Sequence, residues 1–199
     1  MGALALLWQF TRKSNRSISF IPATLLLATA YFFRDPQRKI PEDSNALVAP
    51  ADGKIVSVKD VFEPRFLKSE ATKIAIFLSP FNVHINRSPI EGEVAYTEYK
   101  RGTYYPAYME VASHENETNF IGIENTSEKV LITQIAGILA RRIVCKVSKG
   151  DKVGKGERIG MIKFGSRTEL FLPKGMKITV KEGDRVKAGE SIVALKEGK

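Results

Sequence analysis

A segment near the C-terminus occurs twice, and this repeat constrains the fold more than any other feature of the chain. GDKVGKGERIGMI begins at Gly150 and GDRVKAGESIVAL at Gly183, so the two copies align at an offset of 33 residues and share the pattern Gly-Asp-x-Val-x-x-Gly-Glu. Glycine reaches the positive φ angles of tight turns, and each later Gly-Glu pair precedes an apolar run. The repeat therefore predicts two similar β-hairpins.

Short runs rich in β-branched and aromatic residues dominate the rest of the chain after the first 46 residues. Such runs, separated by Gly, Pro or charged turns, are typical of strands, and no long helical period interrupts them. The fold class is therefore mainly β (α+β), with a barrel-sandwich-like domain over residues 47–199 that resembles lipoyl and biotinyl domains. The predicted strands are Lys73–Leu78, Gly92–Tyr99, Lys129–Ile135, Arg142–Val147 and Met176–Val180.

The N-terminal region contains an uncharged run, Ile18–Phe33, with basic residues on both sides. As a helix its 16 residues would span about 24 Å, which is short of a hydrocarbon core of roughly 30 Å. With the apolar stretch Ala3–Phe10 it forms either a membrane helical hairpin or one span with an interfacial lead-in. A secretory signal and a buried core helix are the alternatives. We expect residues 1–34 to anchor the chain and residues 35–46, with Pro36 and Pro41, to form a linker.

Charge is unevenly distributed along the sequence. The net charge is +9, and within residues 141–199 Lys and Arg outnumber Asp and Glu by 16 to 7. This bias indicates an anionic partner, such as a membrane surface, and no motif typical of nucleic-acid binding accompanies it. Cys145 is the only cysteine, which excludes an intramolecular disulfide and favours the cytosolic side.

Three residues are candidates for chemistry. Asp52 precedes a glycine at the start of a predicted strand, where an aspartate is most often a turn residue. His84 follows an apolar strand between two Ser-Pro breaks and is one of two histidines, the other being His114 in a hydrophilic stretch. Ser166 follows Gly165, and a residue without Cβ lets the backbone strain and the hydroxyl reach the preceding carbonyl.

Four segments in this order and spacing resemble the phosphatidylserine decarboxylase family, in its short, pyruvoyl-dependent subset that includes archaetidylserine decarboxylases. The segments are YFFRDPQRKIP, APADGKI, LSPFNVHINRSP and MIKFGSRTELFLP. The resemblance implies a proenzyme that cuts itself between Gly165 and Ser166 into a β chain, residues 1–165, and an α chain, residues 166–199. Ser166 would become a covalent pyruvoyl group, and His84, oriented by Asp52, would remove the serine proton.

The same resemblance implies a substrate and a reaction. The enzyme would convert phosphatidylserine or archaetidylserine to the ethanolamine lipid and CO2 through a Schiff base with the pyruvoyl group, without pyridoxal phosphate and without a metal. It would work at the cell membrane, with the catalytic domain on the cytoplasmic face. The oligomeric state is left open, a homo-oligomer included.

Two departures from the longer family members qualify this assignment. Those members carry LGST where this chain has Phe164–Arg167, and a His-x-x-His pair where this chain has His84 followed by Arg87. The group that reprotonates the product therefore stays open. The alternative from another class is a membrane-anchored lipoyl-type carrier or adaptor. No lysine sits between apolar neighbours in a short hairpin tip, as in such carriers, and the long heptads of an adaptor are absent from the sequence.

Overall fold

The computed structural model describes residues 16–137, 142–163 and 166–196. The chain divides into two compact units, Met1–Pro36 and Gln37–Lys199. The predicted limits of the anchor, the linker and the catalytic domain stay a prediction.

The described part of the first unit is one helix, α2 (Arg16–Phe32), which contains Pro22. Several of its apolar side chains are exposed, Ile21 at 64% and Leu27 at 70%, while Phe32 is buried. Among the described residues, no helix is both long enough and apolar enough to cross a bilayer. The upstream stretch Ala3–Phe10 lies outside the described residues.

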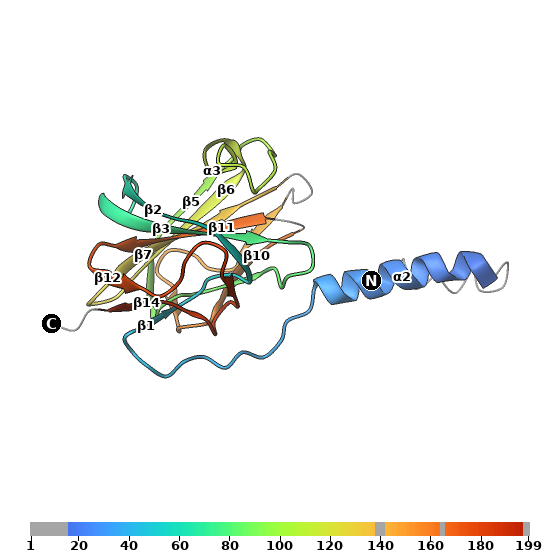
Figure 1. Ribbon diagram of the computed structural model, residues 1–199, viewed down its shortest axis with the longest axis horizontal. Helices are drawn as coiled ribbons and strands as arrows, with labels where there is room; N and C mark the ends of the chain where they lie inside the picture. Colours follow the sequence, from blue (N-terminus) through green and yellow to red (C-terminus); the bar gives the residue numbers. More distant parts are fainter. Residues whose placement is uncertain (1–15, 138–141, 164–165, 197–199) are drawn as a thin grey trace. The chain divides into compact units, whose positions relative to one another are not determined.

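The second unit is mainly β, as the sequence predicts, and its described strands form one large and two small sheets (Figure 1). In spatial order the eight-stranded sheet contains β13 (Arg185–Val186), β2 (Gly53–Glu63), β3 (Ser69–Leu78), β11 (Ser166–Pro173), β7 (Lys129–Ile135), β6 (Thr118–Glu124), β5 (Gly92–Lys100) and β9 (Lys152–Val153). The three-stranded sheets are β1 (Ala46–Val48), β14 (Ile192–Lys196) and β12 (Met176–Ile178), and β4 (Ile85–Arg87), β10 (Arg158–Ile162) and β8 (Ile143–Cys145). A one-turn helix, α3 (Ala112–Glu115), completes the described elements.

All five predicted strands are confirmed, within a few residues at their ends, as β3, β5, β7, β8 and β12. No comparable pattern predicts β11, whose first residue is Ser166. β11 lies between β3 and β7 and pairs antiparallel with both. It therefore occupies a central position in the large sheet.

The two faces of the large sheet differ in character. Ile74 and Ile76 of β3 and Leu170 of β11 are fully buried in one apolar cluster, which defines the core face. Because side chains alternate along a strand, Lys73 and Glu169 belong to the opposite face, here called the outer face. In Figure 1, α3 and the chain around it lie on the side of the large sheet away from β1, β12 and β14.

The sequence repeat is also a structural repeat. The glycines that open the two copies, Gly150 and Gly183, have φ angles of 97° and 96°, and the later pair, Gly156 and Gly189, have 77° and 76°. Gly150 donates a backbone hydrogen bond to Val94 at 2.8 Å, as Gly183 does to Ile55 at 2.9 Å. The duplication predicted from the sequence therefore adopts one conformation twice.

The two arms of each copy do not pair with each other as in a simple hairpin. β9 pairs with β5, while β10 pairs with β4 and β8. In the second copy β13 pairs with β2, while β14 pairs with β1 and β12. The backbone groups of both arms are hydrogen-bonded to other strands, and the two arms belong to different sheets. Each copy therefore forms a corner between two sheets.

Candidate active site

Ser166 is the first residue of β11 and is fully buried. Its Cα pairs with that of Leu78, the last residue of β3, and it belongs to the core face of the sheet. The Ser166 hydroxyl has no hydrogen-bond partner within the described part of the chain. Since buried hydroxyls are normally bonded, this one is available for a reaction. Gly165, the other half of the predicted cleavage site, lies outside the described residues.

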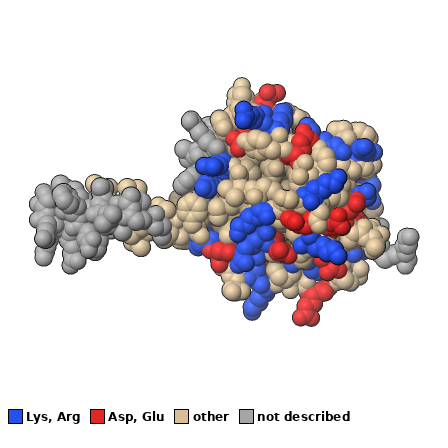
Figure 2. Space-filling model, turned by 180° about the vertical axis from the view of Figure 1, so that it is seen from behind, with Lys and Arg blue, Asp and Glu red and all other residues tan. Residues whose placement is uncertain are grey.

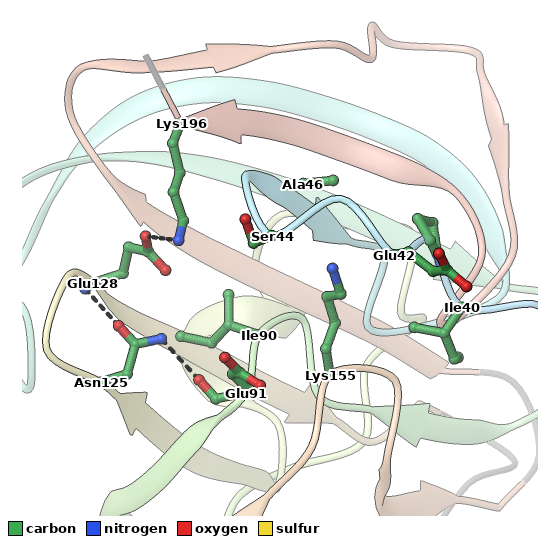
Figure 3. Close-up of a pocket in the computed structure, with 11 residues that line it drawn as sticks. Ile40, Glu42, Ser44, Ala46, Ile90, Glu91, Asn125, Glu128, Lys155 and Lys196 are labelled. Carbon is green, nitrogen blue, oxygen red and sulfur yellow. Dashed lines mark hydrogen bonds and ion pairs between the residues drawn. The ribbon is translucent and has the colours of Figure 1, made fainter. Parts of the chain in front are cut away.

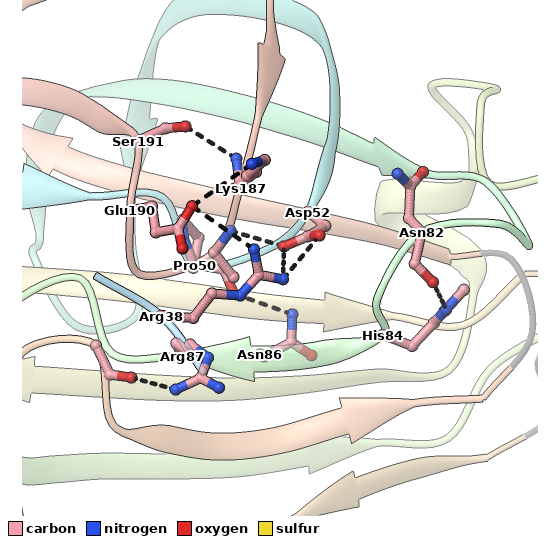
Figure 4. Close-up of polar contacts among 12 residues, drawn as sticks. Arg38, Pro50, Asp52, Asn82, His84, Asn86, Arg87, Lys187, Glu190 and Ser191 are labelled. Carbon is pink, nitrogen blue, oxygen red and sulfur yellow. Dashed lines mark hydrogen bonds and ion pairs between the residues drawn. The ribbon is translucent and has the colours of Figure 1, made fainter. Parts of the chain in front are cut away.

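His84 lies between β3 and β4 and is also fully buried. Its Nδ1 is 2.9 Å from the carbonyl oxygen of Asn82 (Figure 4). A carbonyl only accepts hydrogen bonds, so this contact selects the tautomer with the proton on Nδ1. The Nε2 atom is then the nitrogen that can accept a proton.

The backbone brings His84 towards Ser166. The amide of Ile162 donates to the carbonyl of His84 at 3.2 Å. Ser166 is four residues after Ile162, so the Cα atoms of these two residues are at most about 14 Å apart. Both candidate residues therefore belong to the same end of β3 and β11.

Asp52, which directly precedes β2, is held by other groups. Arg38 Nη2 lies 2.9 Å from each Asp52 carboxylate oxygen, and the amide of Ala188 donates to Oδ1 at 2.8 Å (Figure 4). Within the described residues no contact joins Asp52 to His84, whose Nδ1 is bound to Asn82. The direct orientation of His84 by Asp52 that we expected is not formed, because Arg38 and Ala188 occupy the carboxylate. A catalytic role for Asp52 stays a prediction.

A buried polar network lies beside Ser166 on the core face. The Asn86 amide donates to Thr168 Oγ1 at 2.9 Å and accepts from Gln134 Nε2 at 2.9 Å. Asn119 Nδ2 in turn donates to Gln134 Oε1 at 2.8 Å. Thr168 is two residues after Ser166 and shares its face, so the network fixes the strand that carries the candidate nucleophile.

Sequence reasoning missed both Arg38 and Asn86. Arg38 falls in the segment predicted as a linker, yet its side chain is only 5% exposed. Asn86 lies within the same motif as His84, and that proximity was the available signal. His114 is exposed, as predicted for a residue outside the site.

A cavity of about 380 Å³ lies away from these residues, between the start of the second unit and the turn after β6 (Figure 3). Both of its lysines contact nearby oxygen atoms. Lys196 Nζ is 2.5 Å from Glu128, and Lys155 donates to the carbonyl of Asp43 at 2.6 Å. Asp52, His84 and Ser166 do not line it. The cavity is therefore separate from the candidate active site.

Comparison with known proteins shows the family to which the chain belongs. The family model for phosphatidylserine decarboxylase matches residues 25–194. A phosphatidylserine decarboxylase proenzyme of Carboxydothermus hydrogenoformans is 44% identical over 199 residues, covering all of this chain and 89% of that protein. Proenzymes of the same name from Symbiobacterium thermophilum and Syntrophus aciditrophicus are 41% and 46% identical, over 97% and 87% of this chain and 90% and 82% of their own lengths.

These matches assign the mainly β chain to a class of carboxy-lyases that are made as proenzymes. The chain belongs to the phosphatidylserine decarboxylase family. These matches do not favour the carrier or adaptor alternative.

Proposed function

We propose that this chain is a self-processing decarboxylase of serine phospholipids, phosphatidylserine or archaetidylserine, and that Ser166 is both its cleavage nucleophile and the precursor of its cofactor. The observation that carries the proposal is the Ser166 hydroxyl, which is fully buried and without a partner in the described structure. The residue before it is a glycine, and a buried histidine with a defined tautomer lies at the same end of the sheet.

Self-cleavage begins when His84 Nε2 takes the hydroxyl proton and the Ser166 oxygen attacks the carbonyl carbon of Gly165. The peptide C–N bond breaks as its nitrogen takes the proton held by His84 and becomes an amine, and an ester joins the two residues. Loss of the Cα proton of residue 166 then expels the Gly165 carboxylate by breaking the Cβ–O bond. Hydrolysis of the dehydroalanine releases ammonia and leaves a ketone at position 166.

The residues present fit a pyruvoyl group at this position. Ser166 pairs with Leu78 of β3, and β11 pairs with β7 from Arg167 onwards. A keto group at position 166 would be buried on the core face. A pyruvoyl ketone supplies an electron sink for the carbon that loses CO2, which makes pyridoxal phosphate unnecessary. The chain itself contributes strand β11 as the rigid support and His84 as a group that holds or returns a proton.

We also propose that the second unit meets a membrane through an aromatic surface beside this site. Phe81 and Tyr108 are 75% and 66% exposed, and the other exposed apolar residues of this surface are Tyr104, Tyr105, Met109 and Val111. The Tyr108 ring contacts that of Phe77 at 6.4 Å between centroids, and Phe77 pairs with Arg167, the neighbour of Ser166. Exposed aromatic groups of this kind are typical of the water–lipid interface.

The remaining membrane features are proposals of the same kind. Helix α2, with exposed apolar side chains and basic residues beyond both ends, would attach the chain to the cell membrane, with the catalytic domain on the cytoplasmic face. Figure 2 shows Lys and Arg interspersed with Asp and Glu on one side of the molecule, not a uniformly basic surface. Attraction to anionic lipid would therefore add to the apolar contacts rather than replace them.

A decarboxylation assay tests the proposed activity. Purified full-length protein is mixed with vesicles that contain either phosphatidylserine or archaetidylserine, and released CO2 is measured. We expect turnover of at least one of the two lipids, and none with Ser166→Ala. Absence of turnover with both lipids by fully cleaved protein would refute the proposed substrate class.

A further inference from the structure

A second cavity, of about 350 Å³, lies on the outer face of the large sheet. Lys73 of β3, Glu169 and Phe171 of β11, and Thr133 of β7 line it together with Phe120 of β6. Ser166 belongs to the opposite face of β11, since it is an odd number of residues from Glu169. The cavity is thus distinct from the proposed active site.

The acidic groups in its walls are already occupied. Glu169 forms an ion pair with Arg167 Nη2 at 2.8 Å and accepts a hydrogen bond from the Ser113 hydroxyl at 2.9 Å. Glu63 accepts three backbone amide protons from the turn that follows it, at 2.6 to 2.8 Å. Neither carboxylate needs a cationic ligand.

The donors in the walls are, by contrast, in excess. The Lys73 ammonium, on a side chain only 8% exposed, has an ion pair with Glu169 at 3.6 Å and no hydrogen bond within the described residues. Thr133 is 2% exposed, and its hydroxyl has no partner in the described structure. Its Cα lies opposite that of Glu169 on the adjacent strand. Buried polar groups without partners are rare, and a bound ion is one of the explanations for them.

Apolar groups complete the cavity. Phe171, Leu131 and Phe120 form part of its wall, and the Arg65 guanidinium lies 4.3 Å from the Phe120 ring centroid. Phe62, which is 59% exposed, also contributes. A ligand with an oxyanion could pair with the Lys73 ammonium, while an apolar portion of the same ligand packs against the aromatic rings.

We propose that this cavity binds a phosphate-class oxyanion, with the Lys73 ammonium and the Thr133 hydroxyl as its donors. The Thr133 hydroxyl, which has no partner among the described residues, would donate to the bound oxygen after rotation about the Cα–Cβ bond. The phosphate is either free in solution or the headgroup of a lipid, and the chemistry of the donors is the same for both.

Thermal unfolding of the full-length chain tests this site. Ser166→Ala serves as the background so that the chain stays whole, and the probes are inorganic phosphate and dihexanoyl phosphatidic acid below its micelle concentration. Sodium chloride at matched ionic strength is the reference. We expect at least one probe to raise the unfolding temperature in a saturable manner.

Three variants identify the donors. Lys73→Met keeps the apolar stem and should abolish saturable stabilisation, while Thr133→Val, of nearly equal shape, should weaken binding roughly tenfold. Lys59→Met is the matched control, because Lys59 pairs with Lys73 across β2 and β3 but is 52% exposed and bound to Glu110. It should bind as the background does.

The outcomes separate the sources of phosphate and the competing explanations. Stabilisation by the lipid alone assigns a headgroup site, and stabilisation by inorganic phosphate alone assigns a small-ion site. The proposal is overturned if neither probe acts, if Lys59→Met loses as much as Lys73→Met, or if Thr133→Val binds unchanged. Should Lys73→Met fail to fold, Thr133→Val decides. None of these results depends on self-cleavage, so they leave the proposed function untouched.

Discussion

Arg38 and Asp52 form a two-point ion pair in which one guanidinium nitrogen lies 2.9 Å from both carboxylate oxygens. Both side chains are largely withdrawn from water, at 5% and 11% exposure. Lys39, the next residue, donates its amide to Glu190 at 3.3 Å. The chain that follows the apolar helix is therefore fixed onto the domain that carries Ser166.

Replacement of Arg38 by Met should destabilise the protein by about 3 kcal/mol, because it leaves the Asp52 carboxylate buried without its cation. Urea unfolding of Ser166→Ala protein measures this loss. The double variant with Asp52→Asn should recover part of it. Lys59→Met, which breaks an exposed pair, should cost less than about 1 kcal/mol. Equal costs for the exposed and buried pairs would contradict this reading of Arg38.

Replacement of His84 by Gln should slow self-cleavage by about 100-fold or more, the usual contribution of a general base. A time course of freshly synthesised protein on a denaturing gel measures the rate. His114→Gln is the matched control, since His114 is exposed and should leave the rate unchanged. If the two variants cleave equally fast, His84 is not the base.

Replacement of Asn86 by Leu should destabilise the fold by about 2 to 4 kcal/mol, because it leaves both Thr168 and Gln134 with an unpaired buried group. Asn45→Ala, at an exposed position, should have little effect on unfolding. A loss below 1 kcal/mol for Asn86→Leu would show that water or a rearranged network replaces its amide.

The stability of the protein should depend on pH through Glu98. The Tyr96 hydroxyl and then Arg65, at 2.7 Å from both oxygens, donate to its carboxylate and lower the pKa of Glu98 below its ordinary value of 4.5. A depressed folded-state pKa stabilises the fold above the ordinary value, and that contribution disappears as the pH falls through the lowered one.

Unfolding free energies of wild-type protein and Glu98→Gln test this dependence between pH 7 and about pH 3. The difference between them should be constant near neutral pH and shrink in acid. Tyr96→Phe removes the largest cause of the shift and should weaken the acid dependence. A difference that stays constant across the range would argue against the assigned shift.

The sequence predicts those parts of the fold that depend on local pattern. The β-branched runs form strands, and Gly150 and Gly183 adopt the positive φ angles of turns. Both features follow from the local residue types. β11 was missed because Ser166–Pro173 mixes charged, polar and apolar residues, a mixture that reflects two different environments on its two faces.

The contacts of the candidate site could be predicted only in part. Ser166 and His84 were identified from motifs, but their partners depend on the path of the chain. The Arg38–Asp52 pair joins a segment whose composition indicates a linker to the start of a strand. Asn82 binds His84 through its backbone carbonyl. Every residue type has this carbonyl, so the sequence does not predict the contact.

Intact-mass spectrometry of full-length protein, freshly isolated and active, tests the central claim most directly. We predict two products, residues 1–165 with a free carboxyl terminus and a small chain whose first residue, from Ser166, carries a ketone in place of the amine. Ser166→Ala should give one uncut chain. A single species of 22.1 kDa from active wild-type protein would contradict self-cleavage at this bond.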